Sequence, residues 1–258
     1  MEWLLSRVSS VEWVGPADCV MTLRCGSAFD DARPGQFVML RPRSWASDPL
    51  LPRPLSILSV ESGRVSFLVR VVGRGTRLIA DASVGDEFAL LGPLGTPFPE
   101  PEIGLKAILV AGGVGIAPLL MWAERHRDVS PILLYGARSA RDLALLDRAL
   151  ACTELEVATE DGTAGVEGLV TDLLVSRAVA GGHALVLTCG PWPMMARVAA
   201  LAEENSWQCF ASLEANMACG RGICLGCSVP ARSGEFVTVC RQGPVFDAAE
   251  IQWSGQGG

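Results

Sequence analysis

The sequence predicts a protein of the β plus α/β class, with an N-terminal antiparallel β-barrel, a parallel-sheet α/β domain and a small C-terminal cysteine-rich subdomain. Short apolar runs separated by Gly and Pro fill residues 1–100, strand-like and helix-like segments alternate over residues 101–210, and residues 211–258 hold four closely spaced cysteines. Short, regularly spaced strands are typical of antiparallel barrels, and strand–helix alternation is typical of a parallel sheet covered on both faces. A chain of 258 residues, 50% of them apolar, is long enough to bury more than one core.

The predicted barrel strands coincide with five apolar runs, at 19–25, 36–40, 55–60, 65–72 and 87–91. Gly and Pro between the runs supply the turns. Two further segments stand out in this region, Arg53-Pro54-Leu55-Ser56 at the start of one strand and Gly73-Arg74-Gly75-Thr76 after another. Taken singly, they are an exposed arginine beside a proline turn and an ordinary hairpin turn.

The α/β region is predicted to alternate four strands with three helices. The strands are expected at 107–111, 131–135, 155–159 and 184–188, and the helices at 116–126, 140–151 and 169–179. The uncharged stretch 107–123 imitates a membrane span, but it is short for a bilayer crossing and has three glycines and Pro118 in its middle. It is better explained as a buried strand, a glycine turn and a helix, so no membrane segment is expected.

A glycine turn after the first of these strands indicates a nucleotide site. Residues 112–118 read Gly-Gly-Val-Gly-Ile-Ala-Pro, the pattern G-x-G-x-x-P. Glycine at Gly113 and Gly115 would let the backbone approach a pyrophosphate at the helix N-terminus, and Pro118 is tolerated in the first helical turn. Alone, such a turn could equally serve strand–helix packing. A second signal supports the nucleotide interpretation, because Thr188-Cys189-Gly190-Pro191 follows the last strand, at the sheet edge where ligands bind in open α/β folds.

The C-terminal cysteines carry the most specific pattern in the chain. Cys219, Cys224 and Cys227 stand as C-x4-C-x2-C, and Cys240 follows thirteen positions later, which is the plant-type ligand spacing of a [2Fe–2S] cluster. Glycines between the first three thiols allow sharp turns that point backbone N–H groups at sulfur. A structural zinc site is the alternative, although zinc prefers two close Cys pairs and only Cys224 and Cys227 form one.

Composition and charge narrow the function classes. A net charge of −7 argues against nucleic acid or an anionic membrane as the main partner. The other five cysteines stand singly in apolar surroundings, which suits buried, reduced thiols: Cys19, Cys25, Cys152, Cys189 and Cys209. The N-terminus has no basic start followed by a long apolar run, so no signal peptide is predicted and a cytoplasmic location is expected.

Taken together and in this order, the motifs resemble the ferredoxin reductase superfamily, in which R-x-x-S on a barrel strand holds FAD and G-x-G-x-x-P with C-G-P frames the nicotinamide nucleotide. Within it, the chain most resembles the family of electron-transfer subunits of NAD-linked dihydroorotate dehydrogenase. Further segments carry the resemblance: Leu68-Val69-Arg70, Gly75-Thr76, Gly92-Pro93-Leu94-Gly95, the stretch 160–172, and Gly243-Pro244-Val245-Phe246. Plant-type reductases usually have Tyr where this chain has Leu55, and an aliphatic residue fits the dihydroorotate family better.

The resemblance implies a set of cofactor-binding residues. FAD would be held by Arg53, Pro54, Leu55, Ser56, Leu68, Val69, Arg70, Gly75 and Thr76; NAD by Gly113, Gly115, Pro118, Cys189, Gly190 and Pro191; and the [2Fe–2S] cluster by Cys219, Cys224, Cys227 and Cys240. Arg53 would neutralise an FAD phosphate, and Ser56 would bond near the reactive flavin nitrogen. No catalytic acid or base is expected, because hydride transfer needs none and neither His126 nor His183 lies in a motif.

The resemblance also implies a role in pyrimidine biosynthesis. A partner subunit carrying FMN would oxidise dihydroorotate to orotate, and electrons would pass singly through the cluster to FAD and leave as hydride to NAD⁺. A heterotetramer with two copies of each subunit would follow. The alternatives are another reductase subunit of the superfamily, linked to a hydrogenase, to sulfide or to ferredoxin, and a non-enzymatic zinc-stabilised binding module. Arg138 after the second strand could accept a 2′-phosphate and favour NADP, whereas the resemblance favours NAD.

Overall fold

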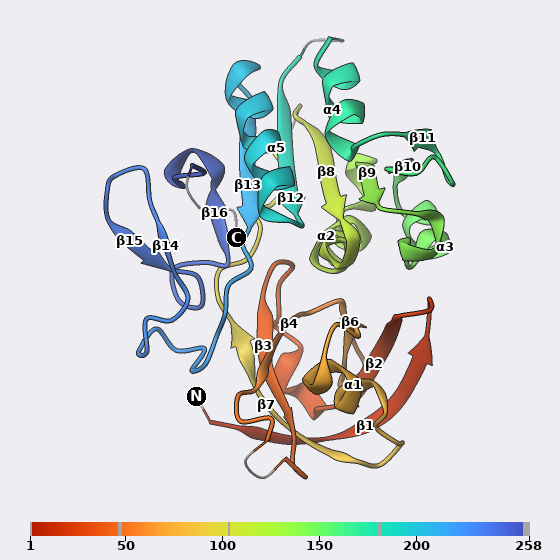
Figure 1. Ribbon diagram of the computed structural model, residues 1–258, viewed down its shortest axis with the longest axis vertical. Helices are drawn as coiled ribbons and strands as arrows, with labels where there is room; N and C mark the ends of the chain where they lie inside the picture. The colour runs from red at the N-terminus through yellow and green to blue at the C-terminus, as the bar shows by residue number, and fades with distance from the viewer. Residues whose placement is uncertain (1, 46–47, 103, 180–181, 255–258) are drawn as a thin grey trace.

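The computed structural model describes residues 2–45, 48–102, 104–179 and 182–254. Residue 1, where the predicted barrel domain begins, and residue 258, where the predicted cysteine subdomain ends, lie outside the described residues. Two seven-stranded sheets form the two large parts, and a small cysteine region lies beside both of them (Figure 1). The β plus α/β class predicted from the sequence is confirmed. None of the described helices is long and apolar enough to cross a membrane.

The first sheet is antiparallel throughout and curves into a half-barrel. Its order is β4-β3-β7-β1-β2-β6-β5. The strands are β1 (Leu4–Trp13), β2 (Asp18–Arg24), β3 (Phe37–Pro42), β4 (Arg53–Ser56), β5 (Ser59–Glu61), β6 (Arg64–Arg70) and β7 (Glu87–Leu94). A 3-10 turn, η1 (Gly26–Phe29), follows β2. The core of the half-barrel includes Met21, Phe67 and Leu90, none of which is exposed.

Two predictions for this sheet need correction. The run 55–60 is not one strand, because the Ile57 N–H bonds to Gln36 before β3 while the Leu58 N–H bonds to Ser66 on β6, so the chain changes partners between them. The segment after β6 is not a hairpin turn but begins helix α1 (Arg74–Ala80). The Thr76 hydroxyl accepts bonds from the N–H groups of Val72 and Gly73, which fixes the start of that helix.

The second sheet has the order β11-β10-β9-β8-β12-β13-β16 and is parallel except for its last pair. Its strands are β8 (Lys106–Gly112), β9 (Ile132–Ala137), β10 (Glu154–Thr159), β11 (Val166–Glu167), β12 (Ala184–Cys189), β13 (Gln208–Ser212) and β16 (Val245–Asp247). Its helices are α2 (Ile116–Arg125), α3 (Leu146–Leu150), α4 (Val170–Val179) and α5 (Trp192–Glu204). The cysteine region thus contributes β16 to this sheet, and the predicted boundary at residue 210 falls inside β13.

The predicted helix at 140–151 is wrong as a single element. The segment divides into a 3-10 turn, η4 (Ala140–Asp142), and the short helix α3. Leu145 adopts a left-handed conformation with φ of 61°, which breaks the helix, while Leu143 and Ala144 are buried beneath the break. Apolar burial therefore decides the local conformation over helix propensity.

The strand order places the glycine turn and the C-G-P segment side by side. The neighbours β8 and β12 lie at the centre of the sheet, where the strand order reverses, and their carboxyl ends face the half-barrel (Figure 1). After β8 comes the turn η2 (Gly113–Gly115), and after β12 comes Gly190. A Cβ on Gly115 would lie 2.2 Å from the Cys189 carbonyl oxygen, so the two turns pack backbone to backbone. Open α/β sheets bind ligands at such a reversal point.

The cysteine region is built on a small hairpin, β14 (Ser228–Pro230) and β15 (Phe236–Thr238), followed by β16 and the turn η5 (Ala248–Glu250). One core cluster includes Met39 of the half-barrel, Val110 of the second sheet and Cys240 of the cysteine region. The three parts therefore share buried surface.

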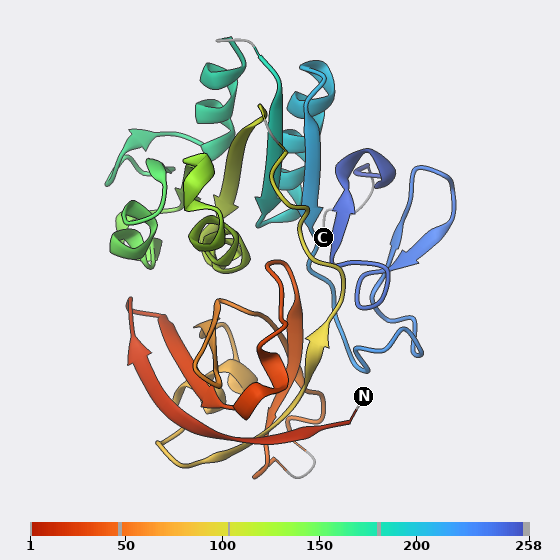
Figure 2. The ribbon, with the colours of Figure 1, turned by 180° about the vertical axis from the view of Figure 1, so that it is seen from behind.

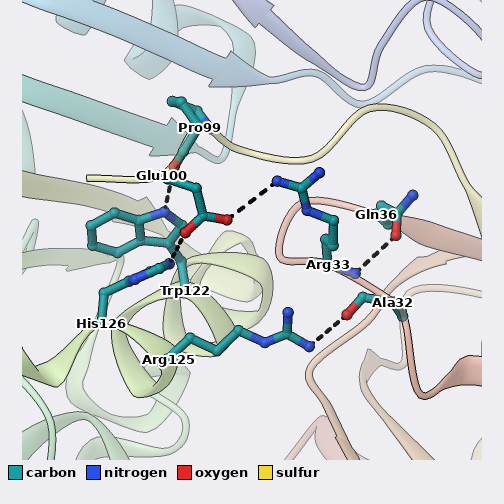
Figure 3. A network of polar contacts seen from close by, with 8 residues as sticks. All are labelled: Ala32, Arg33, Gln36, Pro99, Glu100, Trp122, Arg125 and His126. Atoms are coloured by element: carbon teal, nitrogen blue, oxygen red, sulfur yellow. Dashed lines mark hydrogen bonds and ion pairs between the residues drawn. The ribbon is translucent and has the colours of Figure 1, made fainter. Parts of the chain in front are cut away.

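A polar network connects helix α2, the linker that follows β7 and the half-barrel (Figure 3). Trp122 Nε1 donates to the Pro99 carbonyl at 2.8 Å, and His126 Nε2 lies 3.2 Å from a Glu100 carboxylate oxygen. Glu100 also pairs with Arg33 of the half-barrel at 3.2 Å. Since residues 99 and 100 belong to the linker between β7 and β8, which crosses the junction in Figure 2, the network ties linker, helix and half-barrel together.

Candidate functional site

Two clefts open between the half-barrel and the carboxyl edge of the second sheet. The first, of about 520 Å³, is called here the barrel cleft, and the second, of about 1100 Å³, the sheet-edge cleft. Both clefts are lined by Arg70, Val72, Val114 and Glu214, so they adjoin. A ligand group in one cleft can therefore contact a ligand group in the other.

The barrel cleft contains much of the predicted R-x-x-S strand. Its lining includes the predicted residues Pro54, Leu55, Ser56, Leu68, Arg70 and Thr76. Val69 follows Leu68 on β6 and is fully buried in the half-barrel core, because successive side chains of a strand point to opposite faces. The structure thus brings six of the nine predicted residues to one cavity and turns Val69 away from it.

Arg53 and Gly75, the remaining two predicted residues, lie against each other. A Cβ on Gly75 would be 2.4 Å from Arg53 Nη2, so only glycine leaves room for the guanidinium over the start of α1. Arg53 Nη1 donates to the Leu51 carbonyl at 2.7 Å, and the guanidinium lies 5.6 Å from the Trp45 ring centre. Among the described residues no carboxylate forms an ion pair with Arg53, so its charge is available to an anionic ligand.

Arg70 differs from Arg53 in this respect. Its Nε and Nη2 bond to the two carboxylate oxygens of Asp18 at 2.8 and 2.7 Å, and Nη2 also donates to the Asp142 carbonyl at 2.9 Å. The hydrogen bonds to Asp18 raise the pKa of the Arg70 guanidinium, so its charge is permanent. Arg70 lines both clefts while its charge is already balanced.

The sheet-edge cleft contains half of the predicted nucleotide residues. Gly113, Gly190 and Pro191 line it, whereas Gly115 and Cys189 lie behind it in the packing of the two turns and Pro118 is buried in the first turn of α2. Burial raises the pKa of the Cys189 thiol well above its usual range, which keeps it protonated. Gly115 and Cys189 therefore shape the turns, while the lining glycines expose backbone to a ligand.

Several lining residues were not predicted from the sequence. Arg141 follows β9, Arg197 lies on α5, and Glu214 and Asn216 belong to the segment that joins β13 to the first cluster cysteine. The signal that could have located Glu214 is its place directly after a strand of the parallel sheet, at the ligand-binding edge.

Glu214 is the carboxylate shared by both clefts. The residue is exposed to the space of both clefts. Protein atoms of the cleft walls nevertheless surround its carboxyl group, and the resulting desolvation raises the pKa of the Glu214 carboxyl above its usual range.

The four predicted cluster cysteines come together as two pairs. Cys219 lies beside Cys224, and Cys240 lies beside Cys227, whose sulfur accepts the Cys240 N–H at 3.4 Å. Among the described residues no three or more His, Cys, Asp or Glu side chains are grouped closely enough to hold a metal ion, so the thiols lie as two separate pairs. Two thiol pairs are the ligand set of a two-iron cluster, one pair for each iron.

The loop around these thiols supplies backbone donors. The Arg221 N–H donates to Cys219 Sγ at 3.4 Å and the Gly222 N–H to Cys240 Sγ at 3.1 Å. Burial opposes ionisation of Cys219, but bonds from backbone N–H groups outweigh it and lower its pKa from 9.0 to about 6. Gly222, with φ of 73°, takes the left-handed conformation that this turn requires. The donors and the thiolate fit an iron–sulfur cluster.

The cluster loop packs directly on the half-barrel. A Cβ on Gly220 would lie 2.5 Å from Met39 Cγ on β3, so the loop backbone touches that strand. Segment 212–217 lines the barrel cleft and leads into Cys219. The three candidate sites therefore adjoin one another in the order sheet-edge cleft, barrel cleft, cysteine loop.

Comparisons with known proteins agree with this geometry. Residues 214–252 match the family described as the iron-sulfur cluster binding domain of dihydroorotate dehydrogenase B, and residues 109–200 match the oxidoreductase NAD-binding domain. The chain is 40% identical over 228 residues to the protein of Bacillus velezensis named "Dihydroorotate dehydrogenase B (NAD(+)), electron transfer subunit", covering 84% of this chain and 86% of the relative. A relative of the same name from Desulforamulus reducens is 35% identical over 257 residues, or 96% of this chain and 97% of the relative.

Solved structures show the same fold. The chain superposes with a TM-score of 0.85 and 28% identity on a structure described under "NADH-dependent reduced ferredoxin-NADP oxidoreductase", covering 96% of this chain and 90% of the other. It also superposes on the ferredoxin reductase of carbazole 1,9a-dioxygenase with a TM-score of 0.65 and 22% identity, covering 80% of this chain and 65% of the other.

Proposed function

The chain belongs to the family of electron transfer subunits of dihydroorotate dehydrogenase B, and from this premise we propose that it carries electrons from a dihydroorotate-oxidising partner to NAD⁺. The observation that supports this most directly is the contact between the three sites. A nucleotide cleft, a second cleft and a cysteine loop adjoin without intervening structure. Such an arrangement suits a relay in which each carrier passes electrons to its neighbour.

FAD occupies the barrel cleft in this proposal. Arg53 neutralises a phosphate with its unpaired charge, Gly75 leaves room for that guanidinium, and Ser56 offers a hydroxyl within the cleft, while Thr76 holds the start of α1 in place. The apolar walls formed by Leu55 and Leu68 suit a planar ring system. When bound, FAD supplies hydride exchange with nicotinamide and single-electron exchange with an iron–sulfur cluster.

NAD(H) occupies the sheet-edge cleft. Gly113 and Gly190 expose backbone at the start of α2 and beside α5, where the helix dipoles favour a pyrophosphate. Because Val72 and Val114 line both clefts, they lie where the nicotinamide would meet the flavin and would exclude water from that contact. The chain needs no acid or base for hydride exchange, so its work here is to bind and align.

The cysteine loop holds the [2Fe–2S] cluster through Cys219, Cys224, Cys227 and Cys240. The backbone N–H groups that already point at these sulfurs stabilise the negative charge of the thiolates. Packing of the loop on β3 keeps the cluster close to the barrel cleft.

The partner carries FMN and docks at the cysteine loop. Two large apolar side chains between the first three cysteines are exposed, Ile223 at 75% and Leu225 at 61%, and Phe236 of the β14–β15 hairpin is 70% exposed. Exposed large apolar side chains of this kind are typical of a protein interface. One-electron transfer needs short distances, so this surface would face the partner. We further propose a heterotetramer with two copies of each subunit, located in the cytoplasm.

A second candidate is a reductase subunit that exchanges electrons with a ferredoxin-linked partner. The observation that favours it is the likeness over 96% of the chain to the NADH-dependent reduced ferredoxin-NADP oxidoreductase structure. The same cofactors would serve both roles, so only the partner distinguishes them.

The first experiment is to purify the chain and measure its visible spectrum, iron content and released flavin. The proposal predicts FAD and two irons per chain, with bleaching of both chromophores by NADH. A colourless protein that contains zinc would contradict it.

A further inference from the structure

A bidentate ion pair lies at the junction of the two clefts. Asp18 begins β2 and Arg70 ends β6, and the two residues are direct partners in the antiparallel ladder. The Asp18 side chain is 3% exposed and that of Arg70 is 25% exposed. A carboxylate so deeply buried requires its cation, because leaving either charge alone in the interior is strongly unfavourable.

Arg70 also reaches across to the second sheet. Its Nη2 donates to the Asp142 carbonyl in η4 at 2.9 Å, and a Cβ on Gly113 would lie 3.0 Å from its Nη1. The Asp142 side chain in turn accepts the Ser139 hydroxyl at 2.9 Å. Ser139, Asp142 and Gly113 all line the sheet-edge cleft. One guanidinium thus connects the half-barrel to two separate turns of the nucleotide cleft.

The contrast between the two cleft arginines indicates different roles. Arg53 has no carboxylate partner among the described residues and is free to meet a phosphate, whereas Arg70 has its charge neutralised and three of its bonds already made. The bonds of Arg70 to Asp18 and Asp142 use Nε and Nη2, so a ligand that took either of these nitrogens from Asp18 would leave that carboxylate buried without a partner, and only Nη1 faces the cleft without a bond among the described residues. The geometry therefore favours a structural use of Arg70 at this junction.

We propose that Asp18 and Arg70 are positioning residues for hydride transfer, which fix the distance between the two clefts and couple NAD(H) binding to FAD binding. The inference rests on the proposed function, since it assigns FAD to one cleft and NAD(H) to the other. If FAD and NAD(H) both order the Asp18–Arg70 pair, the binding of one favours the binding of the other. By reciprocity each ligand raises the affinity of the chain for the other by the same factor.

The test compares Asp18→Asn with Glu87→Gln in the full chain loaded with FAD. The first change removes one charge of the buried pair at constant shape, and the second removes the half-buried ion-pair partner of the exposed Arg7 and Arg43 on the same sheet. Three quantities are measured: the FAD dissociation rate with and without saturating NAD⁺, the NAD⁺ affinity by calorimetry with and without FAD, and the single-turnover rate of flavin reduction by NADH.

In the Asn variant we expect FAD to be retained without NAD⁺, the NAD⁺-dependent slowing of FAD release to disappear, and flavin reduction to slow by about tenfold or more. The Glu87 variant should match the unmodified chain in all three. Should Asp18→Asn not fold, Arg70→Lys, which keeps the charge and loses the fork of bonds, is measured in the same way.

Two outcomes would overturn the inference. If the variant keeps the coupling between FAD and NAD⁺ binding and the flavin reduction rate of the unmodified chain, the Asp18–Arg70 pair has no positioning role. If the variant instead loses FAD in the absence of NAD⁺, as expected for Arg53→Ala, Arg70 is a flavin ligand. Failure of the unmodified chain to bind FAD or react with NADH would instead refute the proposed function.

Discussion

Replacing Gly75 with Ala should weaken FAD binding without weakening the fold. The added methyl carbon would stand 2.4 to 2.7 Å from three atoms of the Arg53 guanidinium, so that group must move. The guanidinium is the far end of a flexible side chain, so its displacement costs little stability. Alanine in place of glycine in a helix contributes about 0.5–1 kcal/mol of stability.

The expected loss of FAD affinity follows from the contact that Arg53 would make. A hydrogen bond to a charged group contributes about 1.5–3 kcal/mol, which corresponds to roughly a ten- to hundredfold weaker complex. Gly73→Ala is the matched control, because a Cβ at Gly73 meets nothing within 4 Å. Fluorescence titration gives the FAD dissociation constant, and thermal unfolding of the cofactor-free chain gives the stability.

A double mutant sharpens the test. If Gly75 acts only by making room for Arg53, the Arg53→Ala, Gly75→Ala chain should bind FAD as weakly as Arg53→Ala alone. Unchanged FAD affinity in Gly75→Ala, or additive losses in the double mutant, would refute the reasoning.

Cys224→Ser should lower iron content and remove the reduced-cluster EPR signal, whereas Cys152→Ser, a buried thiol far from the loop in sequence, should leave both unchanged; equal iron in the two variants would count against the ligand assignment. Leu225→Asp places a charge on the exposed rim of the cluster loop and should reduce partner-dependent electron transfer while NADH oxidation with ferricyanide stays normal. Tyr135 is the one tyrosine of the chain, and burial raises its pKa to about 12, so ultraviolet absorbance should show no tyrosinate near pH 10. The unfolded chain ionises Tyr135 near pH 10 while the folded chain does not, so stability should fall as pH rises from 10 towards 12. The buried thiols of Cys19 and Cys209, whose pKa values burial also raises, contribute to the same fall, so Tyr135→Phe should remove only the tyrosine part while leaving the Ala144 N–H without its acceptor. Titration of Tyr135 near pH 10 in the native protein would contradict this.

Sequence reasoning found the features that depend on local spacing. The cysteine loop was identified because three of its four predicted ligands lie within residues 219–227. The glycine turn was identified because its residues follow one another directly. The half-barrel and the parallel sheet followed from periodicity. The five scattered cysteines were predicted to be buried, and this is confirmed.

Features that depend on tertiary contacts were not predicted. Asp18 and Arg70 are 52 residues apart, and only the pairing of β2 with β6 brings them together. Strand β1 carries no continuous apolar run, because several of its side chains are partly exposed, so its periodicity was too weak to find it. Glu214 lies in a segment without a motif, and its place between the clefts comes from the order of the sheet. Whether each predicted cofactor residue touches its cofactor stays a prediction.

The most direct test of the central claim is dihydroorotate-dependent reduction of NAD⁺ by the purified chain, alone and with the catalytic subunit that is proposed to carry FMN. The isolated chain should pass electrons from NADH to an artificial acceptor yet leave dihydroorotate unchanged, because the proposal assigns its two adjoining clefts to FAD and NAD(H) and the oxidation of dihydroorotate to the partner. Addition of the catalytic subunit should start NAD⁺ reduction, and the Cys224→Ser chain should fail to support it. Dihydroorotate oxidation by the isolated chain, or no NAD⁺ reduction with the authentic partner while NADH oxidation is normal, would contradict the account.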